Sequence, residues 1–339
     1  MKELSVVILN WNGKQLMEKF LPSVVKYTPK TTAEVVVADN GSNDGSLEML
    51  QKKFPSVRII SFDHNYGFAE GYNKALLEVD SKYSVLLNSD VEVTDGWTVA
   101  PIEAMNAENS IVCVQPKILA ERNKGYFEYA GAAGGFIDKY GYPFCRGRVL
   151  QVIEKDSGQY DTVSDLLWAS GACLFVRTDV FKLEGGLDGN FFAHQEEIDM
   201  CWRLRSRGYR IICMPRSVIY HYGGATLDME NPRKTFLNFR NSLLTIYKNL
   251  PEKDLRHSLF VRFLLDNIAA LKFLMTGHLQ NANAVFKARK EFRKLVPQYA
   301  IKRKENLEKS TGKAIPEVLQ KSLIVSFYFG GKKKYTDFK

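Results

Sequence analysis

The sequence predicts an α/β domain built on a mainly parallel sheet, followed by a basic and mostly helical C-terminal region. Short β-branched runs alternate with helical patterns over the first ninety residues. Hydrophobic residues make up 45% of the 339 residues, which is enough for a sizeable core and too much for a disordered chain. Charge divides the chain, since residues 1–230 hold 24 basic and 30 acidic side chains and residues 231–339 hold 23 and 8.

The expected elements follow the chain in order. Strands are predicted over residues 4–9, 34–38, 57–61 and 83–87, with crossover helices over 13–26, 46–54 and 69–79. Residues 125–148 are rich in glycine and aromatic residues, so we expect loops and short strands lining a cleft. An apolar run at 166–176, a polar loop at 185–190, a helix over 196–207 closed by Gly208, and a last strand over 210–214 complete this part.

A boundary near residue 230 is predicted, with a catalytic domain over 1–230 and a C-terminal region over 231–339. Amphipathic patterns within residues 252–330 have two interpretations. The helices pack their apolar side on the catalytic domain or on a second subunit, or they lie on an anionic membrane surface. The aromatic and lysine-rich tail after residue 323 fits an interfacial anchor as well. Nucleic acid is disfavoured, because no reader motif is present and the acidic first part would repel phosphates.

The lack of a recognisable signal peptide and the pattern of the cysteines predict a cytoplasmic protein. The N-terminal apolar run ends at Asn10 and lacks the long hydrophobic region of a signal peptide. No segment reaches the roughly 18 apolar residues of a membrane-spanning helix. Five cysteines without a C-x-x-C pair are expected to be reduced structural thiols.

Polar side chains follow each of the four expected strands, in residues 10–13, 39–42, 63–67 and 88–90. In a parallel sheet these positions meet at one edge, where ligands of such folds bind. Asp39 in its Asn- and Gly-rich turn suits a nucleotide, and Asp90 suits a divalent cation beside a pyrophosphate. Ordinary strand-ending turns use the same residue types, so each motif alone leaves both interpretations open.

Three carboxylates cluster at an expected helix start, namely Glu196, Glu197 and Asp199. The helix macrodipole favours acidic residues there, which is the structural interpretation. Two adjacent glutamates below two aromatic residues also favour a raised pKa and use as a general base. Arg203 and Arg205 are expected to be internal ion-pair partners.

His221 follows an apolar run and precedes a pair of glycines. A single histidine is more often structural than a ligand. A neutral imidazole at a strand end is nevertheless a suitable metal ligand to complement Asp90.

Seven segments, taken in order, resemble the family 2 glycosyltransferases, especially the bacterial rhamnosyltransferase-like branch. They span about the first 225 residues and read VVILNWNG, VADNGSNDGS, NYGFAEGYNKAL, LLNSDVEV, WASGACLFVR, GGLDGNFFAHQEEIDMCWRLRSRGYRI and PRSVIYHYGG. The resemblance implies a GT-A fold, a nucleotide-sugar donor, Mg²⁺ or Mn²⁺, and inversion at the anomeric carbon.

The resemblance also implies residue roles. Asp90 matches the last carboxylate of the family's Asp-x-Asp motif, whose first position is Asn88 here, and His221 matches a further metal ligand. The family's base is usually the Asp of a Glu-Asp pair, so its position falls on Glu197, with Glu196 as the alternative and Asp199 completing the acidic set. The expected nucleotide and donor contacts are Asn10, Asp39, Asn65, Gly67, Asn73, Asn88 and Asp90.

The implied reaction moves a sugar from dTDP-rhamnose or a UDP-sugar to a hydroxyl of a glycan or lipid-linked acceptor, in cell-surface polysaccharide synthesis. Single displacement needs one base and no covalent enzyme intermediate, because a nucleoside diphosphate is already a good leaving group. The expected place of action is the cytoplasm, peripherally on the inner membrane. A homo-oligomer is one way to cover the C-terminal helices.

Three other functions compete with this one. A dinucleotide-dependent dehydrogenase would need G-x-G-x-x-G where the first turn reads NWNG. A sugar-nucleotide pyrophosphorylase would need a Gly-rich, basic first loop, and only Lys14 is near. A degenerate polysaccharide-binding or scaffolding protein could explain Asn88 and Glu197, but it does not explain why Asp90 and His221 are both kept.

Overall fold

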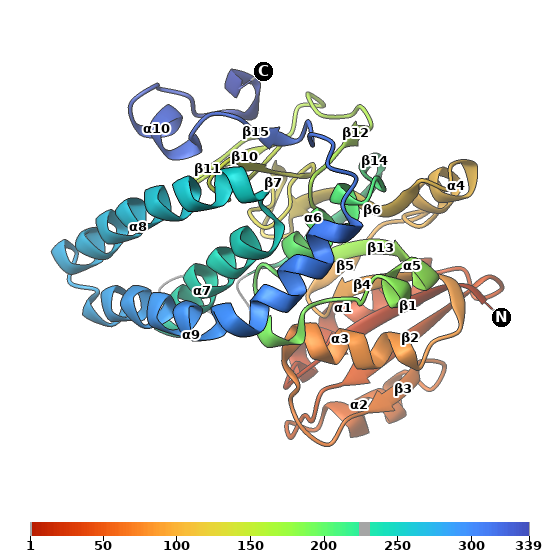
Figure 1. The fold of residues 1–339 in the computed structure, drawn as a ribbon. Coiled ribbons are helices and arrows are strands. Elements are labelled where there is room, and N and C mark those ends of the chain that lie inside the picture. Colours follow the sequence, from red (N-terminus) through yellow and green to blue (C-terminus); the bar gives the residue numbers. More distant parts are fainter. Residues whose placement is uncertain (1, 224–230, 339) are drawn as a thin grey trace.

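A computed structural model describes residues 2–223 and 231–338. The first half of its central sheet is parallel, in the order β4-β1-β2-β3 (Figure 1). These strands and their crossover helices are β1 (Lys2–Asn10), α1 (Lys14–Tyr27), β2 (Ala33–Asp39), α2 (Ser46–Lys53), β3 (Arg58–Ser61), α3 (Gly67–Leu77) and β4 (Ser81–Asn88). All four predicted strands and three predicted helices are confirmed, because each is defined by a local apolar period.

Beyond β4 the ten-stranded sheet becomes mixed, since β13 lies antiparallel between β4 and β6, and β14 runs parallel to β6. Mixed sheets of this kind are common in large α/β folds. The added elements are β5 (Val91–Val93), α4 (Val99–Ala107), β6 (Ile111–Ala120), β7 (Asn123–Phe127), β12 (Ser164–Asp165), β13 (Cys173–Arg177), α5 (Thr178–Leu183), η1 (Gly189–Phe191), α6 (Glu196–Ser206) and β14 (Arg210–His221).

The last predicted strand, over residues 210–214, is too short. Strand β14 continues through Pro215 to His221, and its register against β6 shifts between Met214 and Val218. The irregularity accommodates a proline, which cannot donate a ladder hydrogen bond. As a result, His221 ends a strand of the central sheet.

A second, five-stranded sheet forms from the glycine-rich part of the chain. Its strands are β8 (Gly135–Asp138), β9 (Pro143–Cys145), β10 (Arg148–Val149), β11 (Val152–Ile153) and the C-terminal β15 (Val318–Leu319). The prediction of short strands in residues 125–148 is confirmed. Residues 131–138 are all buried, so these strands form packed structure.

The C-terminal region is helical, as predicted. It contains α7 (Pro232–Asn249), α8 (Glu252–Met275), α9 (Leu279–Lys309), α10 (Leu323–Tyr328) and η2 (Tyr335–Phe338). Helix α7 packs on α6 and α9, and β15 pairs with β8, so the region is joined to the rest of the chain at several places. Helices α8 and α9 project as a long hairpin on the side away from β1–β3 (Figure 1).

The core lies on both faces of the central sheet, with one apolar cluster under α1, α2 and α4 and another around α3, α6 and the second sheet. All five cysteines are buried free thiols, which confirms their predicted structural role. Within the residues described, no helix is long and apolar enough to cross a membrane.

Candidate active site

The ends of three neighbouring strands bring the predicted nucleotide-binding residues to one edge of the sheet. In the parallel ladders Asn10 lies opposite Asp39, and Leu9 lies opposite Asn88. Gly13 completes this edge, because a Cβ there would lie 2.5 Å from Asn10 Oδ1 and 3.7 Å from Ser89 Oγ. The predicted gathering of polar side chains at this edge is therefore confirmed.

Asp39 is fully buried and fixed by two hydrogen bonds. Asn10 Nδ2 donates to its Oδ1 at 3.0 Å, and the backbone N–H of Ser42 donates to its Oδ2 at 3.0 Å. The Oδ1 atom of Asn10 is buried without a protein partner. A buried acceptor of this kind is normally satisfied by a donor. Asn10 thus retains one acceptor for a ligand or water at this edge.

A chain of hydrogen bonds links this edge to the loop before α6. Asn40 Nδ2 donates to Asn65 Oδ1 at 3.0 Å and to the carbonyl of Gly67 at 3.0 Å. The backbone N–H of Phe68 then donates to the carbonyl of Phe192 at 2.6 Å. Gly67 has φ +79°, and a Cβ there would lie 2.6 Å from the Phe192 ring, so the close approach needs glycine.

Asn73 binds a different part of the backbone. Its Nδ2 donates to the carbonyl of Leu187 at 2.8 Å, and its Oδ1 accepts from the N–H of Leu187 at 2.9 Å. This pair ties α3 to the segment that leads into η1. Both polar ends of the Asn73 amide are used by the protein, so the structure gives it an anchoring position, and its contact with donor stays a prediction.

Asp90 and His221 meet across the sheet, although 131 residues separate them. His221 Nε2 lies 3.1 Å from Asp90 Oδ1 and 3.4 Å from Asn88 Nδ2. Both Asp90 and His221 are buried, and the N–H of Gly223 donates to Asp90 Oδ2 at 3.2 Å. Burial would raise the pKa of Asp90, but these hydrogen bonds hold it below its ordinary value.

Glu128 lies on the other side of the His221 ring and was not singled out from the sequence. Its Oε2 lies 3.4 Å from His221 Nδ1, an ion-pair distance without hydrogen-bond geometry. Burial favours the neutral ring, yet Glu128 and Asp90 together raise the pKa of His221 to about 10. The two acidic neighbours therefore favour the protonated form of the ring. A carboxylate within the aromatic stretch YFEYAG was the available signal.

The donor set suits a divalent cation in part. Asp90 oxygen and His221 nitrogen are ligands that Mn²⁺ accepts, and Mg²⁺ sites of nucleotide enzymes take one or two carboxylates with the remaining ligands from phosphates and water. Among residues 2–223 and 231–338, no group of three or more His, Cys, Asp and Glu side chains is arranged to hold a metal ion by itself. A cation here would need a substrate phosphate and a deprotonated His221.

The acidic cluster begins α6. Glu196 is buried and Glu197 is half-buried, and one carboxylate oxygen of each is buried without a partner. Burial raises the pKa of Glu197 to about 7. Burial, with the neighbouring charge of Glu197, raises the pKa of Glu196 well above its usual range. The predicted upward shift is confirmed, and loss of hydration is its main cause.

The loop that presents these glutamates has an unusual backbone. Phe192, His194 and Gln195 have φ of 64°, 71° and 74°, in the left-handed region that non-glycine residues rarely adopt. Asn241 on α7 holds this loop, because its Nδ2 faces the carbonyls of Phe191, Ala193 and His194 at 2.7–3.0 Å. Strained residues persist where their surroundings fix them, and such residues gather at active sites.

The Asp199 carboxylate lies in a network of cations and amides. It accepts from Arg203 Nε at 3.1 Å, Lys248 Nζ at 2.7 Å and Asn249 Nδ2 at 2.9 Å. Lys248 also binds Asp188 Oδ2 at 2.8 Å. Both Asp199 oxygens are occupied, so we assign Asp199 to positioning α6 and not to accepting a proton.

The predicted ion-pair role of the two α6 arginines is confirmed, since Arg203 binds Asp199 and Arg205 binds Glu317 at 2.5 Å. Three further residues of this site were not predicted from the sequence, namely Lys248, Asn241 and Asn249 of α7. No local motif marks them, because their role depends on how α7 packs on α6.

Two surface hollows lie outside this arrangement. One is bordered by Tyr66, Glu70, Asp188, Asn190 and Lys302, beside η1. The other is at the opposite edge of the sheet, near Lys2, Ala33 and Glu34. Ligands of open α/β sheets bind at the carboxyl edge, so the strand ends described above mark the site and the second hollow does not.

Comparison with known proteins identifies the fold and the reaction class. Residues 5–145 match the family model described as "Glycosyl transferase family 2". This segment is a family 2 glycosyltransferase domain. It contains the strand ends of β1, β2 and β4 with Asn10, Asp39, Asn88 and Asp90, and the chain that carries it is a glycosyltransferase.

Two curated relatives share more of the length of this glycosyltransferase. The N-acetylglucosaminyl-diphospho-decaprenol L-rhamnosyltransferase of Mycobacterium tuberculosis is 24% identical over 237 residues, which are 65% of this chain and 76% of that one. The rhamnosyltransferase WbbL of Escherichia coli is 26% identical over 198 residues, which are 56% and 72% of the two chains.

Solved structures confirm the GT-A fold. The mannosyltransferase PcManGT of Pyrobaculum calidifontis, in complex with GDP-Man and Mn²⁺, gives a TM-score of 0.54 at 14% identity, over 90% of this chain and 87% of that one. TarS of S. aureus (residues 1–349), in complex with UDP-GlcNAc, gives 0.54 at 19% identity, over 91% and 89%.

Proposed function

We propose that the glycosyltransferase transfers a sugar, with inversion, from dTDP-rhamnose or a UDP-sugar to a hydroxyl of a glycan or lipid-linked acceptor of cell-surface polysaccharide synthesis. The observation that carries this proposal is the meeting of Asn88, Asp90 and His221 at the carboxyl edge of the sheet, beside the buried Asn10–Asp39 pair. The rhamnosyltransferase relatives support a deoxysugar donor and a lipid-linked acceptor.

In this proposal each group has a separate task. Asp39 and Asn10 hold the nucleoside, and Asn65 with Gly67 shapes the donor side of the loop. Asp90 and His221 would hold a divalent cation, which would neutralise the charge that develops on the departing diphosphate. The relative PcManGT is solved with Mn²⁺, and this supports the metal.

Glu197 is the proposed base. Burial raises its pKa to about 7, close to neutral pH. A carboxyl group with such a pKa is deprotonated in part at that pH and is also a good proton acceptor. As the acceptor oxygen bonds to the anomeric carbon, the hydroxyl proton moves to a Glu197 oxygen, and the bond to the diphosphate breaks. Glu196, whose pKa burial and the neighbouring charge raise well above its usual range, is the protonated partner beside it.

A thermal-shift series tests the donor site first. Nucleoside diphosphates and their sugars would be added with and without Mn²⁺, and a ligand at about 100 times its Kd should stabilise the protein by about 2.7 kcal/mol. The Asp90→Asn variant should lose the metal-dependent part of the shift. Asp95→Asn is the matched control, since Asp95 is an exposed aspartate in the same stretch of chain.

The outcome separates the parts of the proposal. Stabilisation by one nucleotide that depends on Mn²⁺ in the parent and in Asp95→Asn, and not in Asp90→Asn, supports the metal site. A full Mn²⁺-dependent shift in Asp90→Asn would remove Asp90 from the metal. Transfer assays with the nucleotide sugar that binds would then test the acceptor class.

A further inference from the structure

Helix α8 is packed with its polar side inward. Its buried residues include Ser258, Arg262 and Asp266, and both members of the Arg262–Asp266 ion pair are 2% exposed. Arg262 Nη1 also donates to Ser242 Oγ at 2.7 Å and to the carbonyl of Tyr140 at 3.2 Å. The inner contacts of α8 thus satisfy the charged and polar side chains that a surface helix normally turns to water.

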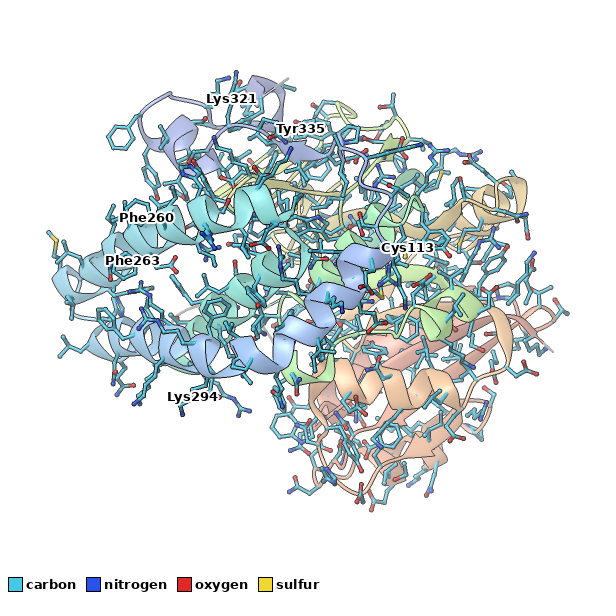
Figure 2. All side chains as sticks on the ribbon, in the orientation of Figure 1. Cys113, Phe260, Phe263, Lys294, Lys321 and Tyr335 are labelled. Carbon is cyan, nitrogen blue, oxygen red and sulfur yellow. The ribbon has the colours of Figure 1, made fainter. Side chains whose placement is uncertain are left out.

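The outer side of the same helix is apolar. The large hydrophobic residues that it exposes are Phe260 (61%), Phe263 (42%), Leu264 (45%), Ile268 (63%), Leu271 (56%), Leu274 (45%) and Met275 (80%). Phe260 and Phe263 are labelled on α8 in Figure 2. Their spacing of three and four residues places them on one side of the helix, in a row about 22 Å long.

This row, which we call the α8 stripe, is Phe260, Phe263, Leu264, Ile268, Leu271, Leu274 and Met275. Single exposed apolar residues are ordinary, but a contiguous patch of them marks an interaction surface. Over residues 260–275 the only exposed charged side chain is Lys272. The stripe therefore has the composition of a buried surface while it faces outward.

One basic residue of α9, Arg289, borders the stripe. The Arg289 guanidinium lies 4.6 Å from the centre of the Phe263 ring, and its Nη1 donates to Asn267 Oδ1 at 3.1 Å. Exposed cations follow along α9, namely Lys287, Lys290, Arg293 and Lys294. Between residues 279 and 294 the only acidic side chain is Glu291, which pairs with Lys294 at 3.6 Å.

We propose that the α8 stripe lies on an anionic lipid surface, with α8 in the membrane plane and the basic side chains of α9 near the headgroups. An apolar helix face bordered by lysine and arginine binds such an interface through both burial and charge. A second copy of the chain fits less well. A two-fold contact through the stripe would set the α9 cations of both copies near one another without a compensating acidic surface.

Vesicle sedimentation of the full chain tests the proposal, and it needs no sugar donor. Failure of the transferase reaction would therefore leave it untouched. The parent protein should bind phosphatidylcholine vesicles containing 30% phosphatidylserine, and it should bind pure phosphatidylcholine much more weakly. The triple variant Phe260→Ser, Ile268→Ser, Leu271→Ser should lose at least about tenfold in partitioning.

Two further proteins make the result specific. Leu77→Ser with Leu183→Ser is the matched control, because these leucines are 70% and 75% exposed on α3 and α5, away from the hairpin. It should bind vesicles like the parent. Lys287→Glu with Lys290→Glu and Lys294→Glu should abolish the preference for phosphatidylserine. Circular dichroism and melting temperatures would show that all variants are folded.

Sedimentation equilibrium supplies the opposing outcome. If the parent is a dimer, the triple variant is a monomer and neither protein binds vesicles, the stripe is a protein interface and the lipid proposal is overturned. Equal binding by parent and triple variant would overturn it as well. A monomeric parent whose binding needs the stripe and anionic lipid supports it.

Discussion

Glu197 combines partial exposure with a buried, unpartnered oxygen, and this pairing distinguishes it from an ordinary first-turn glutamate. We expect Glu197→Gln to lower the transfer rate by about 10²- to 10⁴-fold, the usual contribution of general-base catalysis. Donor binding should persist, because Glu197 is not among the nucleotide contacts. The rate constant at saturating donor and the thermal shift with nucleotide would be measured together.

Glu196→Gln is the matched comparison for that experiment. It removes a charge that burial already suppresses, so its effect on the rate should be small. A large loss in Glu196→Gln with near-normal rates in Glu197→Gln would transfer the base role to Glu196.

The pH profile depends on the same carboxylate. A base must be deprotonated to act, and burial raises the pKa of Glu197 to about 7. Transfer should therefore be slow at pH 5.5, rise through pH 7, and level off above about pH 8. A rate at saturating donor that does not change between pH 5.5 and 8 would contradict the assignment.

At the scale of elements, α6 is held against α7 by Lys248. Its ammonium group binds Asp188 and Asp199, and all three side chains are at most 5% exposed. Lys248→Met should leave two buried carboxylates short of a cation and lower the free energy of unfolding by about 3–5 kcal/mol. Urea denaturation would measure the loss.

Lys302→Met provides the matched control. Lys302 pairs with the same Asp188 at 2.7 Å, but its side chain is 40% exposed, so its loss should cost at most about 1 kcal/mol. Similar costs for both variants would show that the buried pairs have no special weight.

Asp188 makes this contact sensitive to acid. Burial would raise its pKa, but Lys248 and Lys302 together lower it below the ordinary value of 3.8. A lowered carboxylate pKa stabilises the folded state above the unfolded pKa, and this stability is lost as pH falls below about 4. Between pH 6 and pH 3, Asp188→Asn should therefore lose less stability than the parent, as urea midpoints would show.

At the scale of the whole molecule, the C-terminal helices complete the site that precedes them. Asn241 fixes the loop before α6, Lys248 and Asn249 bind Asp199, and β15 extends the second sheet. A chain ending at residue 230 should therefore lack a cooperative thermal transition and expose apolar surface to a dye. The full chain should melt with α6 and α7 together. A stable, cooperatively melting fragment would contradict this.

The parts of the fold that could be predicted from the sequence are those determined by residues close together in the chain. The runs at residues 4–9, 34–38 and 83–87 become β1, β2 and β4, because β-branched alternation and turn residues act within a few positions. The strand-end residues could be found for the same reason.

The missed contacts join distant residues. Glu128 meets His221 and Lys248 meets Asp199 only after packing, and no local period reports such pairs. The orientation of α8 could not be predicted from the sequence either. A helical period shows that two faces of the helix differ in hydrophobicity, but it does not show which face turns inward.

Position 67 is one at which few amino-acid substitutions can be accepted during evolution. A methyl group there would meet the Phe192 ring at 2.6 Å, and the backbone has φ +79°. A smaller side chain at position 192 would remove the collision and leave the dihedral angle unchanged. A substitution at position 192 therefore does not by itself permit another residue at position 67. When position 67 is randomised, we expect selection for folded protein to return glycine alone. The exposed position of Leu77, at the other end of α3, should accept many different residues.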